Sequence, residues 1–330
     1  MNGIFVKHIL VANHHLDKVG GTESYTYAMA EELVKRGYHV EYFTFFRGEV
    51  SHRLEKDFSI RFMSGKKYDL ILANHNTCVN YLFGKGFVIQ TCHGVFPELE
   101  QPSPNADAYV AISEEVKKHL QQLGYTSRVI LNGINLERYR LLQPLHTQLT
   151  CVLSLCHSAM ANAALEKACE GVGTKLIVVD KYNNPVWEVE QKINEADIVV
   201  GVGRSAYEAM ACGRPVIIFD HRDYYPSCGD GYVKDRIGES ILNNCSGRYS
   251  NRSYTALQLE SELRKYDPAD GAFFRKFAEN RLDIRNSVTE YLDYFRDEYR
   301  NVTAVSIAYL RRMWLCRKWR KNLKKKFGDK

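Results

Sequence analysis

The sequence lacks an apolar run long enough to cross a membrane, because no stretch approaches the roughly 18 apolar residues of a transmembrane helix. The apolar N-terminal stretch MNGIFVKHILVANHH has no small-residue cleavage site, so it predicts a first β-strand rather than a signal peptide. Both absences favour a cytoplasmic protein.

Paired cysteine motifs are also absent. The nine cysteines form no Cys-x-x-Cys pair, and several lie in apolar stretches where a thiol packs as a small hydrophobic group. We therefore expect free thiols in a reducing compartment. The neighbours Cys92-His93 and Cys156-His157 do not have the ligand spacing of a zinc site, so neither a metal nor another cofactor is expected.

A net positive charge is absent outside the C-terminal end of the chain. Residues 311–330 hold ten Lys or Arg and one Asp, which gives +9, whereas the whole chain carries +6 and the other 310 residues therefore about −3. Because the rest of the chain is mildly acidic and carries no RNA-binding motif, we expect no nucleic-acid partner.

What the sequence has in abundance is alternation of short β-rich runs with helical patterns, which is typical of doubly wound α/β domains. The 330 residues suffice for two such domains. We expect an N-terminal Rossmann-like domain at 1–140, a linker within 132–148, a second domain at 149–285, and C-terminal helices at 286–330. Predicted strands are Lys7–Ala12, His39–Phe45, Asp57–Phe62, Asp69–Ala73, Phe87–Thr91, Ala108–Ile112, Arg128–Leu131, Cys151–Leu155, Lys175–Val179, Asp197–Val200 and Val216–Phe219; the clearest predicted helices are Glu23–Arg36 and Ser113–Leu123.

The stretch ADIVVGVGRSAYEAMACGRPVIIFD, 196–220, predicts a strand, a glycine corner, a helix and a second strand. The helix would begin near Arg204 and Ser205, where free amides, the helix dipole and a guanidinium suit a phosphate. Glu208 follows one turn later, and a carboxylate beside a phosphate site suits the two hydroxyls of a ribose. The alternative is that Glu208 is an ordinary solvated helix residue.

Two further positions are weaker candidates. Gly20 and Gly21 lie between the first strand and a helix, but they form neither a Gly-x-Gly-x-x-Gly nor a Gly-Lys-Ser/Thr motif, so a plain turn is the alternative. His93 ends an apolar strand at the edge where open parallel sheets bind ligands, although a histidine there can simply be hydrogen-bonded.

Four segments resemble, in order, landmarks of the GT-B-fold glycosyltransferases of family 4: GGTESYTYAMAEELVKRGYHV, AISEEVKKHL, VILNGINLERY and EADIVVGVGRSAYEAMACGRPVI. The resemblance spans about residues 7–220 and implies two Rossmann-like α/β/α domains facing a central cleft. It further implies a retaining, metal-independent hexosyltransferase that uses a UDP- or GDP-linked sugar. By the same resemblance Glu208 binds the ribose and His93 lies near the donor sugar, and a set of backbone amides binds the diphosphate: Gly20, Gly21, Val202, Gly203, Arg204 and Ser205.

The chain departs from the family pattern at two places. Family members often carry a glutamate eight positions before the one at Glu208, and Val200 stands there. Many also carry an Arg and a Lys after the first strand of the second domain, where this chain reads LSLCHSAMANAALEKAC. We predict that Arg204 replaces the missing basic pair as a catalytic residue; the alternatives are a different donor or an inactive enzyme.

The basic C-terminal stretch places Leu315, Trp319, Leu323 and Phe327 four residues apart among cations. This pattern suits an amphipathic helix at an anionic membrane surface, so 310–330 predict a peripheral location and a glycan or lipid-linked acceptor in surface polysaccharide or glycolipid synthesis. The alternative is a helix packed on the first domain. For the whole chain, the alternatives are a nucleotide-sugar epimerase and a non-catalytic nucleotide-sugar-binding protein.

Overall fold

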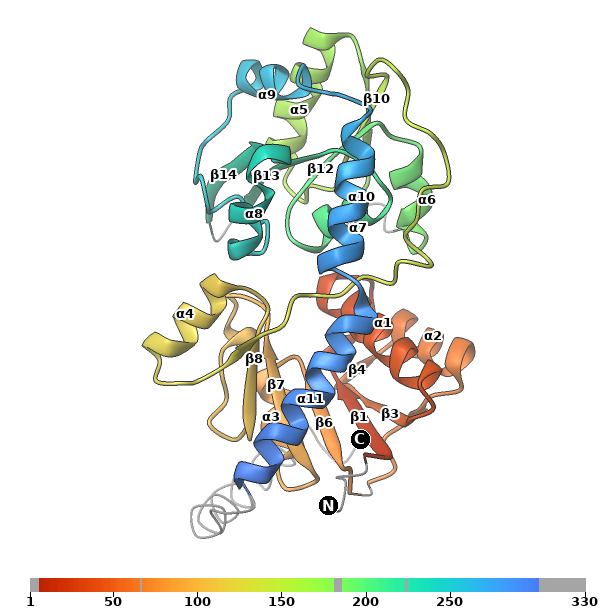
Figure 1. The fold of residues 1–330 in the computed structure, drawn as a ribbon, viewed down its shortest axis with the longest axis vertical. Coiled ribbons are helices and arrows are strands. Elements are labelled where there is room, and N and C mark those ends of the chain that lie inside the picture. Colours follow the sequence, from red (N-terminus) through yellow and green to blue (C-terminus); the bar gives the residue numbers. More distant parts are fainter. Residues whose placement is uncertain (1–5, 66, 181–185, 223–224, 303–330) are drawn as a thin grey trace.

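The computed structural model describes residues 6–65, 67–180, 186–222 and 225–302, and these form two α/β domains stacked end to end (Figure 1). The predicted residues of the basic C-terminal stretch, 310–330, lie outside the described part of the chain.

The N-terminal domain is built on a parallel sheet with the strand order β5-β3-β1-β6-β7-β8-β9. Its central strands are buried and mostly apolar because helices cover both faces of the sheet, and Gln90 and Thr91 are buried polar exceptions. The strands are β1 His8–Ala12, β3 His39–Phe43, β5 Arg61–Phe62, β6 Leu70–Ala73, β7 Phe87–Cys92, β8 Ala108–Ala111 and β9 Arg128–Val129; β2 His15–Leu16 and β4 Phe46–Arg47 pair separately.

Helices pack on the two faces of this sheet in two apolar clusters. One contains Leu33 and Leu54, from α1 Gly21–Lys35 and α2 Glu49–Phe58. The other contains Val79 and Val116, from α3 Asn76–Leu82 and α4 Glu114–Gln122. The side chain of Ser113 accepts a hydrogen bond from the amide of Val116, which confirms Ser113 as the predicted N-cap.

The C-terminal domain has the strand order β11-β10-β12-β13-β14, in which only the edge strand β14 is antiparallel to its neighbour. Its strands are β10 Cys151–Ser154, β11 Lys175–Val178, β12 Ile198–Gly201, β13 Val216–Arg222 and β14 Tyr225–Tyr232. Its helices are α5 Ala159–Val172, α6 Val189–Asn194, α7 Arg204–Ala211, α8 Ile237–Ser240, α9 Ala256–Leu263 and α10 Asp270–Arg281; the chain also forms 3-10 turns at η1 Glu98–Glu100, η2 Lys234–Arg236 and η3 Ile241–Asn243.

The chain passes between the domains twice, and the two passages are hydrogen-bonded side by side. The amide of Ile134 donates to the carbonyl of Leu282 at 2.6 Å, and the amide of Ile284 donates back to the carbonyl of Ile134 at 3.0 Å. A Cβ on Gly133 would lie 2.5 Å from the Cα of Ile284, so the close approach requires glycine. The paired passages form a hinge along one edge of both domains.

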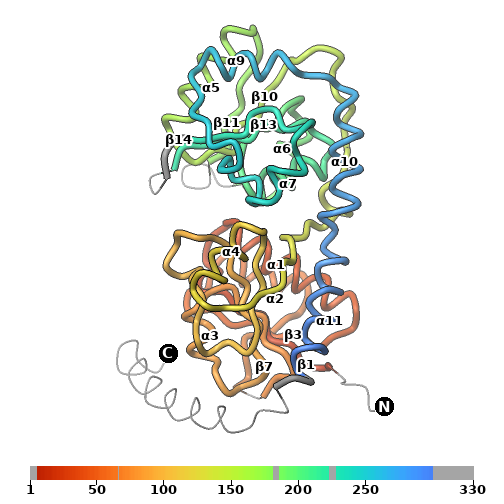
Figure 2. Tube along the Cα trace, turned by 60° about the vertical axis from the view of Figure 1, so that its left-hand side comes forward, coloured from red at the N-terminus to blue at the C-terminus, as the bar shows by residue number. Residues whose placement is uncertain are grey.

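After the second passage, α11 Ile284–Val302 returns to the N-terminal domain, as Figure 2 shows. Its residues Val288, Tyr291 and Phe295 are buried in the cluster that also contains Ile9 of β1. This helix lies at the start of the region 286–330, for which C-terminal helices were predicted. Its apolar face is covered by the first domain. The first domain therefore includes residues from both ends of the described chain.

Most predicted elements are confirmed, with shifts at their ends. The predicted strand Asp57–Phe62 is wrong in its first half, because α2 continues to Phe58 and leaves only Arg61–Phe62 for pairing with β3. The last residues of the predicted first domain, 1–140, pack on the second domain instead, since Leu136 and Tyr139 belong to a core cluster of the second domain.

The sequence lacks paired cysteine motifs and long apolar runs, and the described residues bear on both points. The eight cysteines in this part of the chain are all buried free thiols, as predicted. No helix within the described ranges is both long and apolar enough to span a bilayer.

Candidate functional site: a cleft between two helix N-termini

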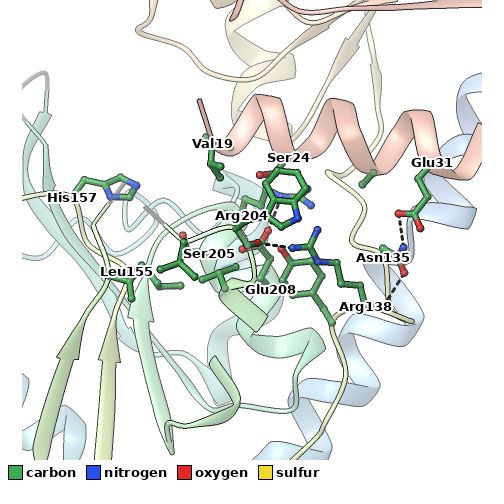
Figure 3. A pocket seen from close by; sticks show the side chains of 18 residues that line it. Val19, Ser24, Glu31, Asn135, Arg138, Leu155, His157, Arg204, Ser205 and Glu208 are labelled. Atoms are coloured by element: carbon green, nitrogen blue, oxygen red, sulfur yellow. Dashed lines mark hydrogen bonds and ion pairs between the residues drawn. The ribbon is translucent and has the colours of Figure 1, made fainter. Parts of the chain in front are cut away.

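A cavity lies between the two domains where the N-termini of α1 and α7 meet (Figure 3). It encloses about 880 Å³, including space open to solvent. We call it the α1–α7 cavity. Its lining includes Gly20, Gly21, Arg204, Ser205 and Glu208, so the fold brings together predicted site residues that are almost 200 positions apart.

The glycine turn lets the backbone of the N-terminal domain approach this cavity. Gly20 caps α1 in an extended conformation, and the carboxylate of Glu23 occupies the space that a Cβ on Gly20 would need. A Cβ on Gly21 would meet nothing within 4 Å, which places open space beside this residue. The first turn of this 15-residue helix therefore lines the cavity with bare backbone at Gly21, and its own acid, Glu23, lies close to Gly20.

The second domain contributes the corner between β12 and α7. Gly203 has φ +60°, a conformation that favours glycine, and its amide donates to the carbonyl of Cys245 at 2.9 Å. This turn aims the N-terminus of α7 at the N-terminus of α1. Two positive helix ends thus face one cavity, which suits an anion with more than one negative charge.

Glu208 lies one turn inside α7 and is 7% exposed. The Nε of Arg204 donates to its Oε1 at 2.8 Å, and the Nη1 of Arg204 donates to the carbonyl of Gly133 in the hinge at 3.2 Å. Burial raises the pKa of Glu208, and the Arg204 guanidinium opposes that rise. The prediction that Arg204 offers its whole fork to a phosphate therefore needs correction, because two of its three nitrogens already contact the protein.

The sequence did not single out several residues that line the same cavity. Asn135 and Arg138 come from the segment just after the hinge, and Trp187 precedes α6. Arg138 Nη2 donates to the Trp187 carbonyl at 2.5 Å and to Glu190 Oε2 at 3.2 Å. Arg138 follows the stretch Asn-Gly-Ile-Asn, which interrupts the alternation of strands and helices, and this was the one feature of the sequence that could have drawn attention to it. No feature of the sequence pointed to Trp187.

His157 is the other cation-capable residue in the cavity. It follows β10, in the region where the resemblance led us to expect an Arg and a Lys. Its Nδ1 lies 4.0 Å from Oδ1 of Asp180. The position of the missing basic pair is thus held by an imidazole beside a carboxylate.

A second cavity lies on the other side of the β12–α7 corner and encloses about 670 Å³, including open space. We call it the Glu100 cavity. Three predicted site residues line it, namely His93, Val202 and Gly203. The predicted site residues are therefore divided between two cavities that adjoin at the β12–α7 corner.

His93 lines the Glu100 cavity as a neutral imidazole. Its Nε2 lies 3.0 Å from Oδ1 of Asn74, whose Nδ2 donates to Thr26 Oγ1, so His93 donates this hydrogen bond. Burial, with Arg204 nearby, lowers the pKa of His93 to about 3. His93 can therefore orient a sugar by hydrogen bonding, but it does not supply a proton as an imidazolium near neutral pH.

Glu100 is a carboxylate of this second cavity that the sequence analysis overlooked, and it lies on a 3-10 turn seven residues after His93. Its Oε2 occupies the space that a Cβ on Gly94 would take. Burial raises the pKa of Glu100 to about 7, Arg222 opposes the rise, and Glu23 adds to it.

This raised pKa makes the stability of the fold depend on pH. Because the folded pKa lies above the ordinary 4.5, the stabilisation is fully present below about pH 4.5 and is lost as the pH rises through about 7. We expect the wild type to lose up to about 3 kcal/mol relative to Glu100→Gln between pH 4.5 and 8. Urea unfolding of both proteins across this range measures the difference, and parallel curves would contradict it.

Val200, which stands where the family often has a second glutamate, is fully buried in the core of the C-terminal domain. No group of three or more His, Cys, Asp or Glu side chains that could hold a metal ion occurs among the described residues.

No protein-family model and no curated protein matches this sequence. Solved structures do match it over most of their length. A glycosyltransferase from Rickettsia africae ESF-5 aligns with a TM-score of 0.60 at 14% identity, covering 90% of this chain and 99% of its own. An α-glucosyltransferase in complex with UDP and a 13-mer DNA containing a HMU base aligns with a TM-score of 0.55 at 11% identity, covering 88% of this chain and 100% of its own. The UDP-GlcNAc 2-epimerase from Neisseria meningitidis, bound to UDP-GlcNAc, aligns with a TM-score of 0.52 at 12% identity, covering 87% of this chain and 99% of its own.

The architecture and these similarities together establish the GT-B fold, with two Rossmann-like domains and a C-terminal helical stretch, as the sequence predicted. At these identities the similarity concerns the fold.

Proposed function

We propose that this chain is a glycosyltransferase that moves a hexose-type sugar from a nucleotide-diphosphate sugar to an acceptor hydroxyl. The observation that carries the proposal is the α1–α7 cavity, in which two helix N-termini face each other with Glu208 one turn away. The helix N-termini can bind a diphosphate, and the carboxylate of Glu208, one helical turn away, can accept hydrogen bonds from the hydroxyls of the attached ribose. The apolar lining of Val179, Val186 and Val189 beside Trp187 suits a base.

The residues then divide the chemistry between them. The acceptor oxygen bonds to the anomeric carbon while the bond from that carbon to the phosphate oxygen breaks, and its electron pair stays on the leaving diphosphate. Amides at Gly20, Gly21, Arg204 and Ser205, together with the Arg204 guanidinium, stabilise this negative charge. The Gly203 amide, which the resemblance assigned to the diphosphate, instead donates to the carbonyl of Cys245. In the retaining route that the family resemblance implies, the leaving phosphate also takes the proton of the acceptor hydroxyl, so no metal is needed.

The donor is proposed to be a UDP- or GDP-linked sugar, and the acceptor a glycan or a lipid-linked sugar in surface polysaccharide or glycolipid synthesis. Of the solved structures with the same fold, the α-glucosyltransferase is in complex with UDP and the 2-epimerase is bound to UDP-GlcNAc. The basic stretch 310–330 is proposed to contact an anionic membrane surface, where lipid-linked acceptors are held.

A nucleotide-sugar epimerase is the second candidate, because the UDP-GlcNAc 2-epimerase structure shares this fold. Both candidates use the same nucleotide site, and a non-catalytic nucleotide-sugar-binding protein would use it as well. The reaction product separates the three: a glycosylated acceptor, a second free nucleotide sugar, or no product.

The proposed function is tested first by thermal melting of the wild type with UDP, GDP, ADP and CMP. A nucleotide present at about 100 times its Kd adds about 2.7 kcal/mol to the free energy of unfolding. The nucleotide that raises Tm then selects the sugar nucleotides for product analysis by chromatography. Failure of all four nucleotides to raise Tm would overturn the proposal.

A further inference from the structure

The Glu100 cavity contains polar groups that the protein does not satisfy. The Glu100 carboxylate has no hydrogen-bond donor or ion-pair partner among the described residues, although it lies half-buried in the cavity wall. On the opposite wall, Asn244 Oδ1 and Ser246 Oγ are buried, and neither has a partner within the described part of the chain. Buried polar atoms in native proteins are nearly always hydrogen-bonded, so these groups indicate a polar ligand.

The charged groups around this carboxylate are mostly neutralised by one another. Arg248 makes a bidentate pair with Glu115 across the two domains, at 2.7 and 2.5 Å, and Arg222 Nε lies 3.2 Å from Asp220 Oδ2. The titratable and charged groups that face Glu100 are Glu23 on α1, Cys92 and His93 at the end of β7, and Asp220, Arg222 and Arg248 on the second domain. Cys92 and His93 are neutral at pH 7, since burial raises the pKa of the thiol to about 12 and lowers that of the imidazole to about 3.

The position of the cavity decides which ligand these groups would meet. Val202 and Gly203 line the Glu100 cavity, while Arg204 and Ser205, the next two residues, line the α1–α7 cavity. A diphosphate bound at the N-terminus of α7 would therefore have its sugar at this corner. A hydroxyl that attacks the sugar would enter from the Glu100 cavity.

We propose that the Glu100 cavity is the acceptor subsite, that it takes a hydroxyl-bearing sugar, and that the ionised Glu100 carboxylate, rather than the leaving phosphate, accepts the hydrogen bond and then the proton of the attacking hydroxyl as its oxygen bonds to the anomeric carbon. Asn244 and Ser246 bind further hydroxyls of the same acceptor from the second domain. The proposal rests on the proposed function, and it assigns to the N-terminal domain a carboxylate contact that Val200 does not provide. Gly94 belongs to this arrangement because any side chain there would displace the carboxylate.

The experiment uses the full chain and water as the acceptor probe, by measuring release of UDP from UDP-glucose or GDP from GDP-mannose, whichever nucleotide raises Tm. We expect Glu100→Ala to lower the release rate about 100-fold at pH 8 while the Kd of the free nucleotide changes less than twofold. The wild-type rate is expected to rise from pH 5.5 to 8 with a midpoint near 7, and Glu100→Gln is expected to lack that midpoint. Glu98→Gln, an exposed acid on the same 3-10 turn, is the matched control and retains the wild-type rate and midpoint.

Each outcome bears on one of the two proposals. An unchanged rate and pH profile in both Glu100 variants would overturn the acceptor role, as would a wild type that binds the nucleotide but releases none from its sugar. Failure of every nucleotide to bind the wild type would instead overturn the proposed function itself. Thermal melting of each variant without nucleotide shows whether the variant is still folded, so that a lower release rate in a folded variant can be assigned to the lost hydrogen bond.

Discussion

Replacing Glu208 with glutamine is expected to weaken binding of the nucleoside diphosphate by at least about 100-fold, which corresponds to about 2.7 kcal/mol. The carboxylate is buried at the cavity wall, where Arg204 and Tyr139 hydrogen-bond to it and hold it in place for a ribose. The amide of glutamine keeps the shape but offers only one acceptor. Isothermal titration with UDP and GDP measures the change, and Glu166→Gln, an exposed acid on α5, is the control.

The same substitution also affects the fold, and this effect has to be separated from binding. Removing one partner of a buried ion pair leaves the other charge uncompensated, at a cost of about 3–5 kcal/mol, whereas replacing both partners by apolar groups is often neutral. We therefore expect Glu208→Gln to lower Tm. The double variant Arg204→Leu with Glu208→Leu is expected to recover much of the stability without recovering nucleotide binding. Wild-type affinity in the double variant would show that Glu208 has no role in the ligand site.

The second large effect is expected at Arg204. Its Nη2 group has no hydrogen-bond partner among the described residues, so this edge of the guanidinium remains for the leaving diphosphate. A preorganised donor to the developing charge is worth about 10²–10³ in kcat. Arg204→Lys retains a positive charge beside Glu208 but loses the planar fork, so we expect kcat to fall about 100-fold with nucleotide affinity within tenfold of the wild type.

Arg204→Ala is expected to lower both quantities, because it removes the charge that holds Glu208 and the hydrogen bond to the hinge carbonyl of Gly133. Steady-state kinetics of nucleotide release and titration with the free nucleotide give the two numbers for each variant. If turnover and affinity remain at wild-type values in Arg204→Ala, Arg204 is only a structural link between α7 and the hinge.

Much of the fold could be predicted from the sequence because its strands are short apolar runs that alternate with helices. The boundary errors have local causes. The apolar Phe58 ends α2 rather than beginning a strand, and its neighbour Ser59 adopts a left-handed conformation that stops the helix. β14 was not predicted at all, since its glycines and polar residues, 225–232, have no strand pattern and the strand forms by pairing with β13.

The candidate site was predictable mainly within one short segment, although Gly20, Gly21 and His93 were also found from their places at the ends of strands. The segment 195–217 holds the corner, the helix start and Glu208 together, so local spacing was informative. Glu100, Arg138 and Trp187 lie in irregular segments outside that stretch, and their proximity to it depends on how the two domains face each other.

The sequence by itself determined the alternation of strands and helices, the glycine corner before α7, and the burial of the cysteines, because each depends on residues close in the chain. Only the tertiary structure decided that Arg204 pairs with Glu208 and reaches the hinge, that α11 completes the first domain, and that the corner separates two cavities. These features join residues that are far apart in the chain, such as Ile9 and Phe295, which are 286 positions apart. No local pattern encodes such contacts, since they arise from the packing of two domains about one hinge.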